Sequence, residues 1–433
     1  MRLEADGMLG AILASESLGL TDTMINGAGG CRSRSQIVMH DAIPSYYPEN
    51  QSCCRSKYFS QQSRLPCTYL NNEDIVFGTA EKVSRGIESV ASITGRRALL
   101  LDTLGASLLC TDYSGLTGNA ETDPIQIQGD LSAMSMAEGY DVTVRTLLSS
   151  VDIEDGDDGS VNVLGYGLMD FGWEAGEKQL RSILESMGLR VNCMMGCLPK
   201  KEEILSCGKA SLNIMIHPEF CRQTAEMLKE RFGTDYLRLS MGAPVGYQSV
   251  RSFIREVASA TGKDPTLALS MVDKDAEEVH RHLMNYERIP VSLHAKGFVI
   301  KAESSIVYPL MRWMMETFGM VPRHIIPLDD EYGQEIRDYL AEHGFQQALE
   351  GCEGEIEAVF SDGMDALKGS MAVSTTGYVE IRPPRSGYMD LMDRTIVGIS
   401  GCRYVLDAMM NGITRFRCGQ PTEVMYRPGY EEE

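Results

Sequence analysis

Residues 161–167 read Val-Asn-Val-Leu-Gly-Tyr-Gly and begin the segment that decides the fold class. This short apolar run is typical of a buried strand that ends at a glycine turn. A helical pattern follows over 177–187, with apolar residues on one face, and the residues 188–191 start another strand. A strand, a helix and a second strand in succession predict parallel strands joined by a crossover helix.

The same alternation extends towards both ends of the chain. On the N-terminal side we predict a helix over 8–18 and a strand over 22–25, and on the C-terminal side a strand over 296–302 and a helix over 305–318. An acidic linker over 152–160 separates the first cycle from the second. The expected fold class is therefore α/β with parallel sheets, in three repeated units rather than one large sheet.

Composition excludes several kinds of partner. Lys plus Arg total 40 against 61 for Asp plus Glu, which gives a formal net charge of −21. This balance argues against nucleic acid and against an anionic membrane, because both attract clustered cations. The sequence shows neither a secretory signal nor an apolar stretch long enough to span a bilayer, so we expect a cytoplasmic protein.

Nucleotide-binding motifs are missing. No Gly-x-x-x-x-Gly-Lys-Ser/Thr string occurs, and Gly165-x-Gly167 lacks the third glycine of a dinucleotide loop. We therefore expect that this chain binds no nucleotide.

One glycine-rich loop indicates a different chemistry. Asn26-Gly27-Ala28-Gly29-Gly30-Cys31 follows the predicted strand over 22–25. Small residues bring backbone N–H groups together, which suits an anionic group such as a cluster sulfide, and a thiolate there would be stabilised. A strand-to-helix turn with an incidental cysteine explains the same pattern, and the local residues leave both interpretations open.

Three stretches together resemble the nitrogenase component 1 family. They are Leu9-Gly10-Ala11, the loop that ends at Cys31, and Asn72-Glu73-Asp74-Ile75-Val76-Phe77-Gly78, which is the most specific. The family includes the molybdenum-iron protein subunits, the cofactor-assembly scaffold, dark-operative protochlorophyllide reductase and the coenzyme F430 reductive cyclase. Weaker similarity covers nearly the whole chain, although Asn26 stands where the family usually has histidine.

The resemblance implies an architecture and an activity. It implies three Rossmann-like domains, which we place at 1–150, 151–290 and 291–385, with a C-terminal helix and tail over 386–433. It also implies an oxygen-sensitive oxidoreductase that reduces a small molecule, a tetrapyrrole being one candidate. A [4Fe–4S] cluster would lie at a subunit interface of a homodimer or heterotetramer, and an ATP-hydrolysing iron protein would supply electrons. The alternatives are an iron–sulfur assembly scaffold and a non-catalytic partner subunit.

The resemblance assigns the cluster-binding loop first. It places Gly29, Gly30 and Cys31 in contact with the cluster, with Cys31 as a ligand. The family's upstream cysteine is missing, and only Asp6 offers a ligand atom there. A gap-free match puts Leu104 at the position of the third family cysteine.

Other cysteines are candidates for the incomplete ligand set. Cys110 lies six residues after Leu104, and Cys67 lies just before the Glu-Asp motif, so we predict both as ligands beside Cys31. Cys53 and Cys54 lie on a loop that could fold over the same site. Either a homologous subunit completes the set, or two copies of this chain share it.

His217 replaces the cysteine that the family uses to bind its large active-site cofactor. No histidine occurs over 377–398, where the second ligand of that cofactor would lie, so the sequence argues against nitrogen fixation. His217 either lines a substrate cavity or is a polar-paired histidine at a strand end. We predict Cys193, Cys197 and Cys207 as core residues, and Arg382, Arg385 and Arg394 as ordinary surface ion pairs or anchors for substrate carboxylates.

Overall fold

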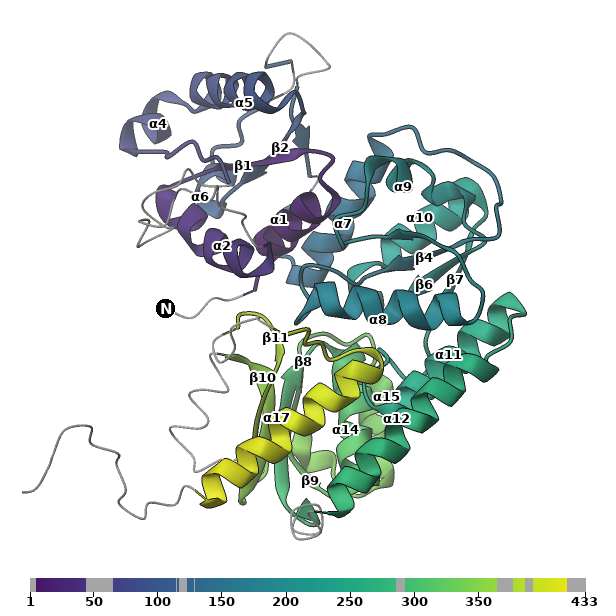
Figure 1. Cartoon of the computed structure of the whole chain (residues 1–433). Helices are drawn as coiled ribbons and strands as arrows, with labels where there is room; N and C mark the ends of the chain where they lie inside the picture. Colours follow the sequence, from purple (N-terminus) through teal and green to yellow (C-terminus); the bar gives the residue numbers. More distant parts are fainter. Residues whose placement is uncertain are drawn as a thin grey trace, which may run out of the picture.

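The computed structural model describes residues 5–43, 65–113, 115–116, 123–127, 129–285, 293–363, 377–385 and 392–418. It contains three parallel sheets, each built from a different part of the chain (Figure 1). The predicted α/β class with parallel sheets is confirmed.

The first sheet has the strand order β1-β2-β3. β1 and β2 pair in register from Asp22 opposite Ala98 to Asn26 opposite Asp102, so both strands end at the same edge. Its strands and helices are β1 (Asp22–Asn26), β2 (Ala98–Asp102), β3 (Ile125–Gln126), α1 (Gly7–Leu18), α2 (Gly29–Ala42), α4 (Asn72–Phe77), α5 (Ala80–Thr94) and α6 (Leu104–Ser107).

The second sheet has the order β5-β4-β6-β7, and helices connect its strands. Its elements are β4 (Val161–Leu164), β5 (Val191–Met194), β6 (Leu212–Met215), β7 (Asp235–Arg238), α8 (Trp173–Ser186), α9 (Lys201–Leu205), η1 (Cys207–Lys209), η2 (Pro218–Phe220), α10 (Arg222–Phe232), α11 (Tyr247–Thr261) and α12 (Thr266–Met284). The sequence pattern did not reveal α12, because only Ala268 and Val272 of this long helix are buried.

The third sheet has the order β11-β10-β8-β9. Its elements are β8 (Gly297–Ala302), β9 (Val321–Pro327), β10 (Ile356–Asp362), β11 (Gly377–Arg382), α14 (Ser304–Phe318), α15 (Gly333–Glu342), η3 (Gln346–Leu349) and α17 (Gly398–Cys418). The C-terminal helix α17, yellow in Figure 1, packs on β11 and returns to α8 and α11 of the second part. Ion pairs from Arg403 to Asp275 and Glu278 hold α17 against α12.

Helix α7 (Met136–Ser149) joins the first and second parts of the molecule. It crosses α1 so closely that a Cβ on Gly10 would lie 2.0 Å from the Met136 carbonyl oxygen, which only glycine permits. Its Asp141 carboxylate accepts hydrogen bonds from the first N–H groups of α10. Because α7 contacts both parts, the domain boundary expected at residue 150 stays a prediction.

None of the described helices combines the length and the apolar character that crossing a membrane requires. The fold instead brings polar residues to the carboxyl ends of its parallel strands, where α/β proteins bind ligands. Two such places are considered below, one after β1 and β2 and the other after β4, β6 and β8.

Candidate functional site

The glycine-rich loop after β1 is held by a buried polar network around Asn26. The Asn26 amide donates to Asp102 Oδ1 at 2.8 Å and to the Tyr113 hydroxyl at 2.7 Å. The Thr68 hydroxyl donates to Asn26 Oδ1 at 2.9 Å and accepts from the Gly27 N–H at 3.0 Å. Asn26 therefore ties the loop to β2 and to the segment that carries Cys67.

Cys31 and Cys67 lie on the two sides of this loop. The Cys67 thiol is half-buried and donates to the Gly27 carbonyl oxygen at 3.3 Å, while Cys31 is exposed in the first turn of α2. Burial raises the pKa of the Cys67 thiol, and Cys31 raises it further, whereas the Tyr69 N–H and Arg32 oppose the rise. The Cys67 thiol also lies 3.9 Å from the Ala28 carbonyl oxygen, which accepts the Cys31 N–H at 3.2 Å, so both cysteines contact the same loop residue.

The other predicted ligands do not join this pair. Cys110 is exposed beyond the end of α6, and no described contact links it to Cys31 or Cys67. Asp6 caps α1 by accepting the Leu9 N–H at 3.0 Å. Cys53 and Cys54 lie outside the described residues.

The described residues by themselves do not form a complete metal site. Among the described residues, no group of three or more His, Cys, Asp or Glu side chains is arranged to hold a metal ion. The set of Cys31, Cys67 and Cys110 therefore stays a prediction, of which the structure brings the first two together.

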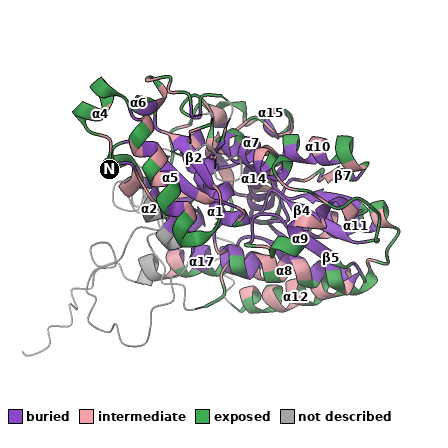
Figure 2. Ribbon diagram, turned by 90° about the horizontal axis from the view of Figure 1, so that it is seen from above, coloured by how far each residue is buried: buried purple, intermediate pink, exposed green. Residues whose placement is uncertain are grey.

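The helix α4, which follows Cys67 in the chain, carries an exposed apolar surface. Ile75, Val76 and Phe77 of α4 are 53 %, 73 % and 86 % exposed, and α4 appears green in Figure 2. A capping box between Asn71 and Asp74 begins this short helix, and Lys82 pairs with Asp74 at 2.7 Å. The most specific sequence motif thus forms a polar-anchored helix that presents its apolar residues outward, as protein interfaces do.

Leu104 and Leu108 extend this surface along α6, with exposures of 58 % and 75 %. Leu104 directly follows Thr103, whose N–H donates to the Asn26 carbonyl oxygen at 3.0 Å. The residue at the family's third cysteine position is therefore an apolar side chain next to the glycine loop.

The second candidate site is a buried polar chain after β4, β6 and β8. His217 Nε2 lies 2.9 Å from Asp170 Oδ1, and His217 Nδ1 lies 2.6 Å from the Ser305 hydroxyl. That hydroxyl donates to Glu219 Oε1 at 2.6 Å. The His217 side chain is only 1 % exposed, and that of Glu219 only 3 %.

The titratable groups of this buried polar chain shift one another's pKa values. Burial disfavours the charged form of His217, but the Asp170 carboxylate outweighs it and raises the pKa of His217 to about 9. Burial and the Asp329 carboxylate raise the pKa of Glu219 to about 8, against the opposing effect of His217. Both shifts favour the retention of protons in the folded protein.

Arg382 forms a buried ion pair beside this chain rather than a surface one. Its guanidinium donates to Glu303 Oε1 at 2.9 Å and lies 3.7 Å from Asp362 Oδ2, and the side chains of Arg382 and Glu303 are each about 10 % exposed. Burial opposes the charge on Glu303, but Arg382 prevails and lowers the pKa of Glu303. The surface alternative for Arg382 was wrong, because β11 ends between buried elements.

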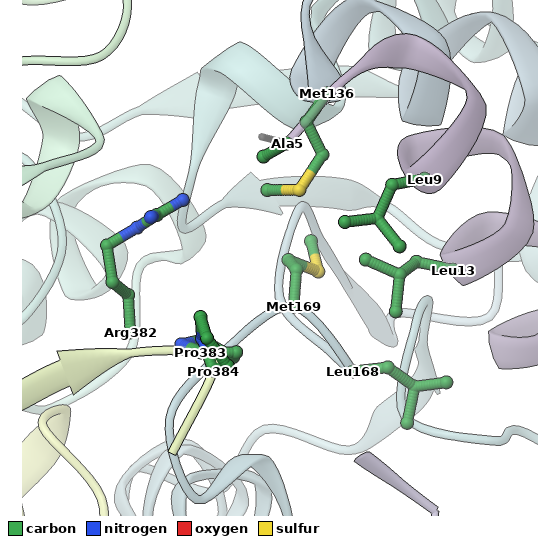
Figure 3. A pocket seen from close by; sticks show the side chains of 9 residues that line it. All are labelled: Ala5, Leu9, Leu13, Met136, Leu168, Met169, Arg382, Pro383 and Pro384. Carbon is green, nitrogen blue, oxygen red and sulfur yellow. The ribbon is translucent and has the colours of Figure 1, made fainter. Parts of the chain in front are cut away.

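A small cavity lies on the other side of Arg382, between α1, α7 and the loop after β4 (Figure 3). Its volume is about 30 Å³, which suits one or two waters rather than an organic substrate. His217 does not line it, so the expectation that His217 faces a substrate stays a prediction. The lining residues are Ala5, Leu9, Leu13, Met136, Leu168, Met169, Arg382, Pro383 and Pro384.

The three cysteines of the second part are core residues, as predicted. Cys193, Cys197 and Cys207 are buried, and burial raises the pKa of each thiol. They are therefore neutral thiols, unlike the thiolates that bind metals.

The sequence analysis missed Asp170, Glu219 and Ser305. They are far apart in the chain, and the one shared signal is that each follows a predicted strand of an α/β cycle. Asn26 was noticed only as a departure from the family's histidine, and its buried amide network was not foreseen.

Comparisons with known proteins identify the family of this chain. Residues 7–414 match the family described as Nitrogenase component 1 type Oxidoreductase. The chain is 28 % identical over 216 residues to a subunit of the light-independent protochlorophyllide reductase of Halorhodospira halophila (strain DSM 244 / SL1), a match that covers 46 % of this chain and 40 % of the relative. It is 22 % identical over 300 residues to the nitrogenase molybdenum-iron protein alpha chain of Methanosarcina barkeri, covering 66 % and 54 %.

Each match thus spans less than two thirds of its relative's length. A solved structure of nitrogenase Cp1 at pH 6.5 has the same fold, with a TM-score of 0.74, 14 % identity and coverage of 99 % of this chain and 97 % of that chain. The resemblance inferred from the glycine loop and the Glu-Asp motif is confirmed. The chain belongs to the nitrogenase component 1 type oxidoreductase family.

Proposed function

We propose that this chain is a subunit of a nitrogenase-like reductase and that Cys31 and Cys67 supply part of the ligand set of an interface [4Fe–4S] cluster. The observation that carries the proposal is that Cys31, with an exposed thiol, and Cys67, with a half-buried one, both hydrogen-bond to Ala28 of the glycine loop. A cluster bound there would supply low-potential one-electron transfer.

The residues present suit part of such a group. Thiolates are the soft ligands that iron–sulfur clusters take. Gly29 and Gly30 begin α2, whose first N–H groups lack intrahelical partners, and a Cβ on Gly30 would meet no atom within 4 Å. The loop thus offers N–H groups and open space next to Cys31.

The incomplete ligand set points to a second chain. A [4Fe–4S] cluster is held by one thiolate per iron. Two copies of this chain would supply that number from Cys31 and Cys67, and a homologous subunit with more cysteines would complete the set in a heterotetramer. Either partner would cover the apolar surface of α4 and α6.

The electron donor would be a separate ATP-hydrolysing iron protein in the cytoplasm, since this sequence has no phosphate-binding loop. The relative named as part of a protochlorophyllide reductase makes a tetrapyrrole one candidate substrate. The cavity beside Arg382, about 30 Å³ in volume, is far smaller than a tetrapyrrole, so such a substrate would bind elsewhere. His217 in place of a cofactor cysteine argues against nitrogen as the substrate.

An assembly scaffold is the weaker alternative. A scaffold for a large cluster needs space where His217 lies, and in the described residues that place is filled by Asp170, Ser305 and Glu219 at hydrogen-bonding distances. A large cluster would have to break this buried chain.

The test is anaerobic purification followed by iron and acid-labile sulfide analysis, with the chain expressed alone and together with a homologous subunit. About four irons per dimer, lost in Cys31→Ala and Cys67→Ala and kept in the buried control Cys402→Ala, would support the proposal. Iron retained in Cys110→Ala would remove Cys110 from the ligand set. Absence of iron in every wild-type preparation would overturn the proposal and leave a non-catalytic partner subunit.

A further inference from the structure

The buried polar chain connects the second and third sheets through four side chains. Asp170 follows β4, His217 and Glu219 follow β6, and Ser305 begins α14 after β8. Only Ser305 belongs to the third part, and it lies 2.6 Å from both His217 Nδ1 and Glu219 Oε1. A hydroxyl from the third part therefore lies between two titratable groups of the second part, whose His217 Nδ1 and Glu219 Oε1 atoms are 3.8 Å apart.

Counting hydrogens shows what the hydroxyl permits. If Ser305 donates to the Glu219 carboxylate, it must accept from a proton on His217 Nδ1, and the Asp170 carboxylate favours a second proton on Nε2. If Ser305 instead donates to Nδ1, it must accept from a protonated Glu219. The two arrangements contain the same number of protons. They differ in whether one proton is on His217 or on Glu219, and in the orientation of the Ser305 hydroxyl.

The surroundings favour retention of that proton. Other carboxylates near the chain are Asp329 beside Glu219 and Glu303 beside His217, and Arg382 neutralises Glu303. Tyr166 stacks on His217 at 6.1 Å between ring centroids, and the Cys221 thiol donates to the His217 carbonyl oxygen at 3.4 Å.

At the Glu219 end of the buried polar chain, one carboxylate oxygen lacks a hydrogen-bond partner. Glu219 Oε2 is buried and has no hydrogen-bond partner, although a buried carboxylate oxygen without one is costly. Every other oxygen along the route from His217 to Glu219 is engaged. An unpartnered oxygen at the end of a proton-carrying chain suits a group that gives its proton to a bound molecule.

We propose that Asp170, His217, Ser305 and Glu219 form a proton relay that supplies a proton to the substrate reduced between the second and third sheets. This inference rests on the proposed function, because the electrons come from its low-potential iron–sulfur donor. Two-electron reduction of an unsaturated bond takes up two protons, and the relay supplies one of them. The substrate class is thus an unsaturated molecule that must be protonated away from bulk water.

Each proton that moves between these four side chains has a donor and an acceptor. The Ser305 proton moves to Glu219 while the His217 Nδ1 proton moves to Ser305, which leaves neutral His217 and protonated Glu219. The Glu219 carboxyl group then rotates and gives its proton to the reduced substrate, which takes its second proton from solvent, and a solvent hydronium ion returns a proton to His217. Asp170 keeps the ring oriented and stabilises its charge, so it acts as a positioning residue.

The first experiment needs neither iron nor substrate. Histidine ring nitrogens of the full-length chain are followed by NMR during a pH titration, and His217→Asn assigns the signal. Glu219→Gln should lower the pKa of His217, because the variant removes one of the carboxylates that stabilise the imidazolium. Glu335→Gln, on the half-buried Arg238 ion pair, is the control and should leave the pKa of His217 unchanged.

Variants of Ser305 test the link itself. Ser305→Ala should weaken the effect of Glu219→Gln on the pKa of His217 without abolishing it, because His217 Nδ1 and Glu219 Oε1 lie 3.8 Å apart. Ser305→Thr keeps the hydroxyl and the full coupling. Ser305→Thr also covers the case in which the alanine variant does not fold. An unchanged His217 titration in both Glu219→Gln and Ser305→Ala would overturn the relay.

The second experiment uses the reductase assay with an iron protein. Glu219→Gln should lower kcat by about 100-fold, leave KM nearly unchanged and alter the pH profile, which a purely structural clasp would not do. Coupled titration with an unchanged kcat would refute the relay while the proposed function stands. Absence of reduction by the wild type would refute the proposed function, and the NMR result would still be readable.

Discussion

The glycine loop after β1 and the polar chain after β6 occupy equivalent places at the carboxyl ends of parallel strands, yet they are opposite in burial. Cys31 is exposed beside an uncovered apolar surface, whereas His217 is 1 % exposed and touches groups from two sheets. The first place is incomplete within one chain, and the second is nearly closed.

The contrast has a physical basis. An exposed thiol makes few contacts and contributes little to folding, so it remains available to a ligand or partner. Buried charges are tolerated only when they are paired, so the polar chain and the Arg382 ion pair are part of the folded core. Changes at the buried place should therefore affect stability strongly, and changes at the exposed place should affect binding.

Breaking the buried ion pair should have the largest effect. Arg382→Met leaves Glu303 without its guanidinium and should lower the free energy of unfolding at pH 7 by about 3–5 kcal/mol. Chemical denaturation measures the change. The double variant Arg382→Met with Glu303→Gln should recover part of the loss, and equal stabilities of wild type and Arg382→Met would contradict the burial of this pair.

The pH dependence of stability should come mainly from the polar chain. His217 titrates at about 9 in the folded protein against 6.5 unfolded, so its contribution is complete below pH 6.5 and is lost as the pH rises through 9. Glu219, raised to about 8, also takes up a proton on folding and has the same sign. From His217 alone, denaturation at several pH values should show a fall in the free energy of unfolding of up to roughly 3 kcal/mol, and the fall should be shallower in His217→Asn.

The support of the glycine loop should matter less. Asn26→Ala removes the amide between Asp102 and Tyr113 and should cost about 1–3 kcal/mol. It should also loosen the loop, so the Cys31 thiol should react differently with a thiol reagent in this variant. Unaltered stability together with unaltered Cys31 reactivity would show that the network does not position the loop.

The exposed thiol itself should have the smallest effect on stability. Cys31→Ser should change the free energy of unfolding by less than about 0.5 kcal/mol. Cys402→Ser places a hydroxyl at a fully buried position of α17 and should cost about 1–3 kcal/mol. A destabilisation of Cys31→Ser as large as that of Cys402→Ser would remove the contrast between the two environments.

Much of the fold followed from local pattern. The α/β alternation, the strands β1, β4 and β8 and the helices α1 and α14 were predicted within a few residues, because apolar periodicity reports burial directly. Helix α8 begins at Trp173, four residues before the predicted start. β7, β11 and α12 were missed, since β7 and α12 carry few buried apolar residues.

The sequence alone determined the family, the class of the fold and the position of Cys31 at the end of the glycine loop, because these depend on contiguous residues. Only the tertiary structure decided that Cys67 and Cys31 contact the same loop residue, that Arg382 is buried with Glu303, and that Ser305, 88 residues after His217, contacts both His217 and Glu219. The physical reason is that a buried polar group requires a partner, and the packing of separate sheets chooses that partner irrespective of distance along the chain.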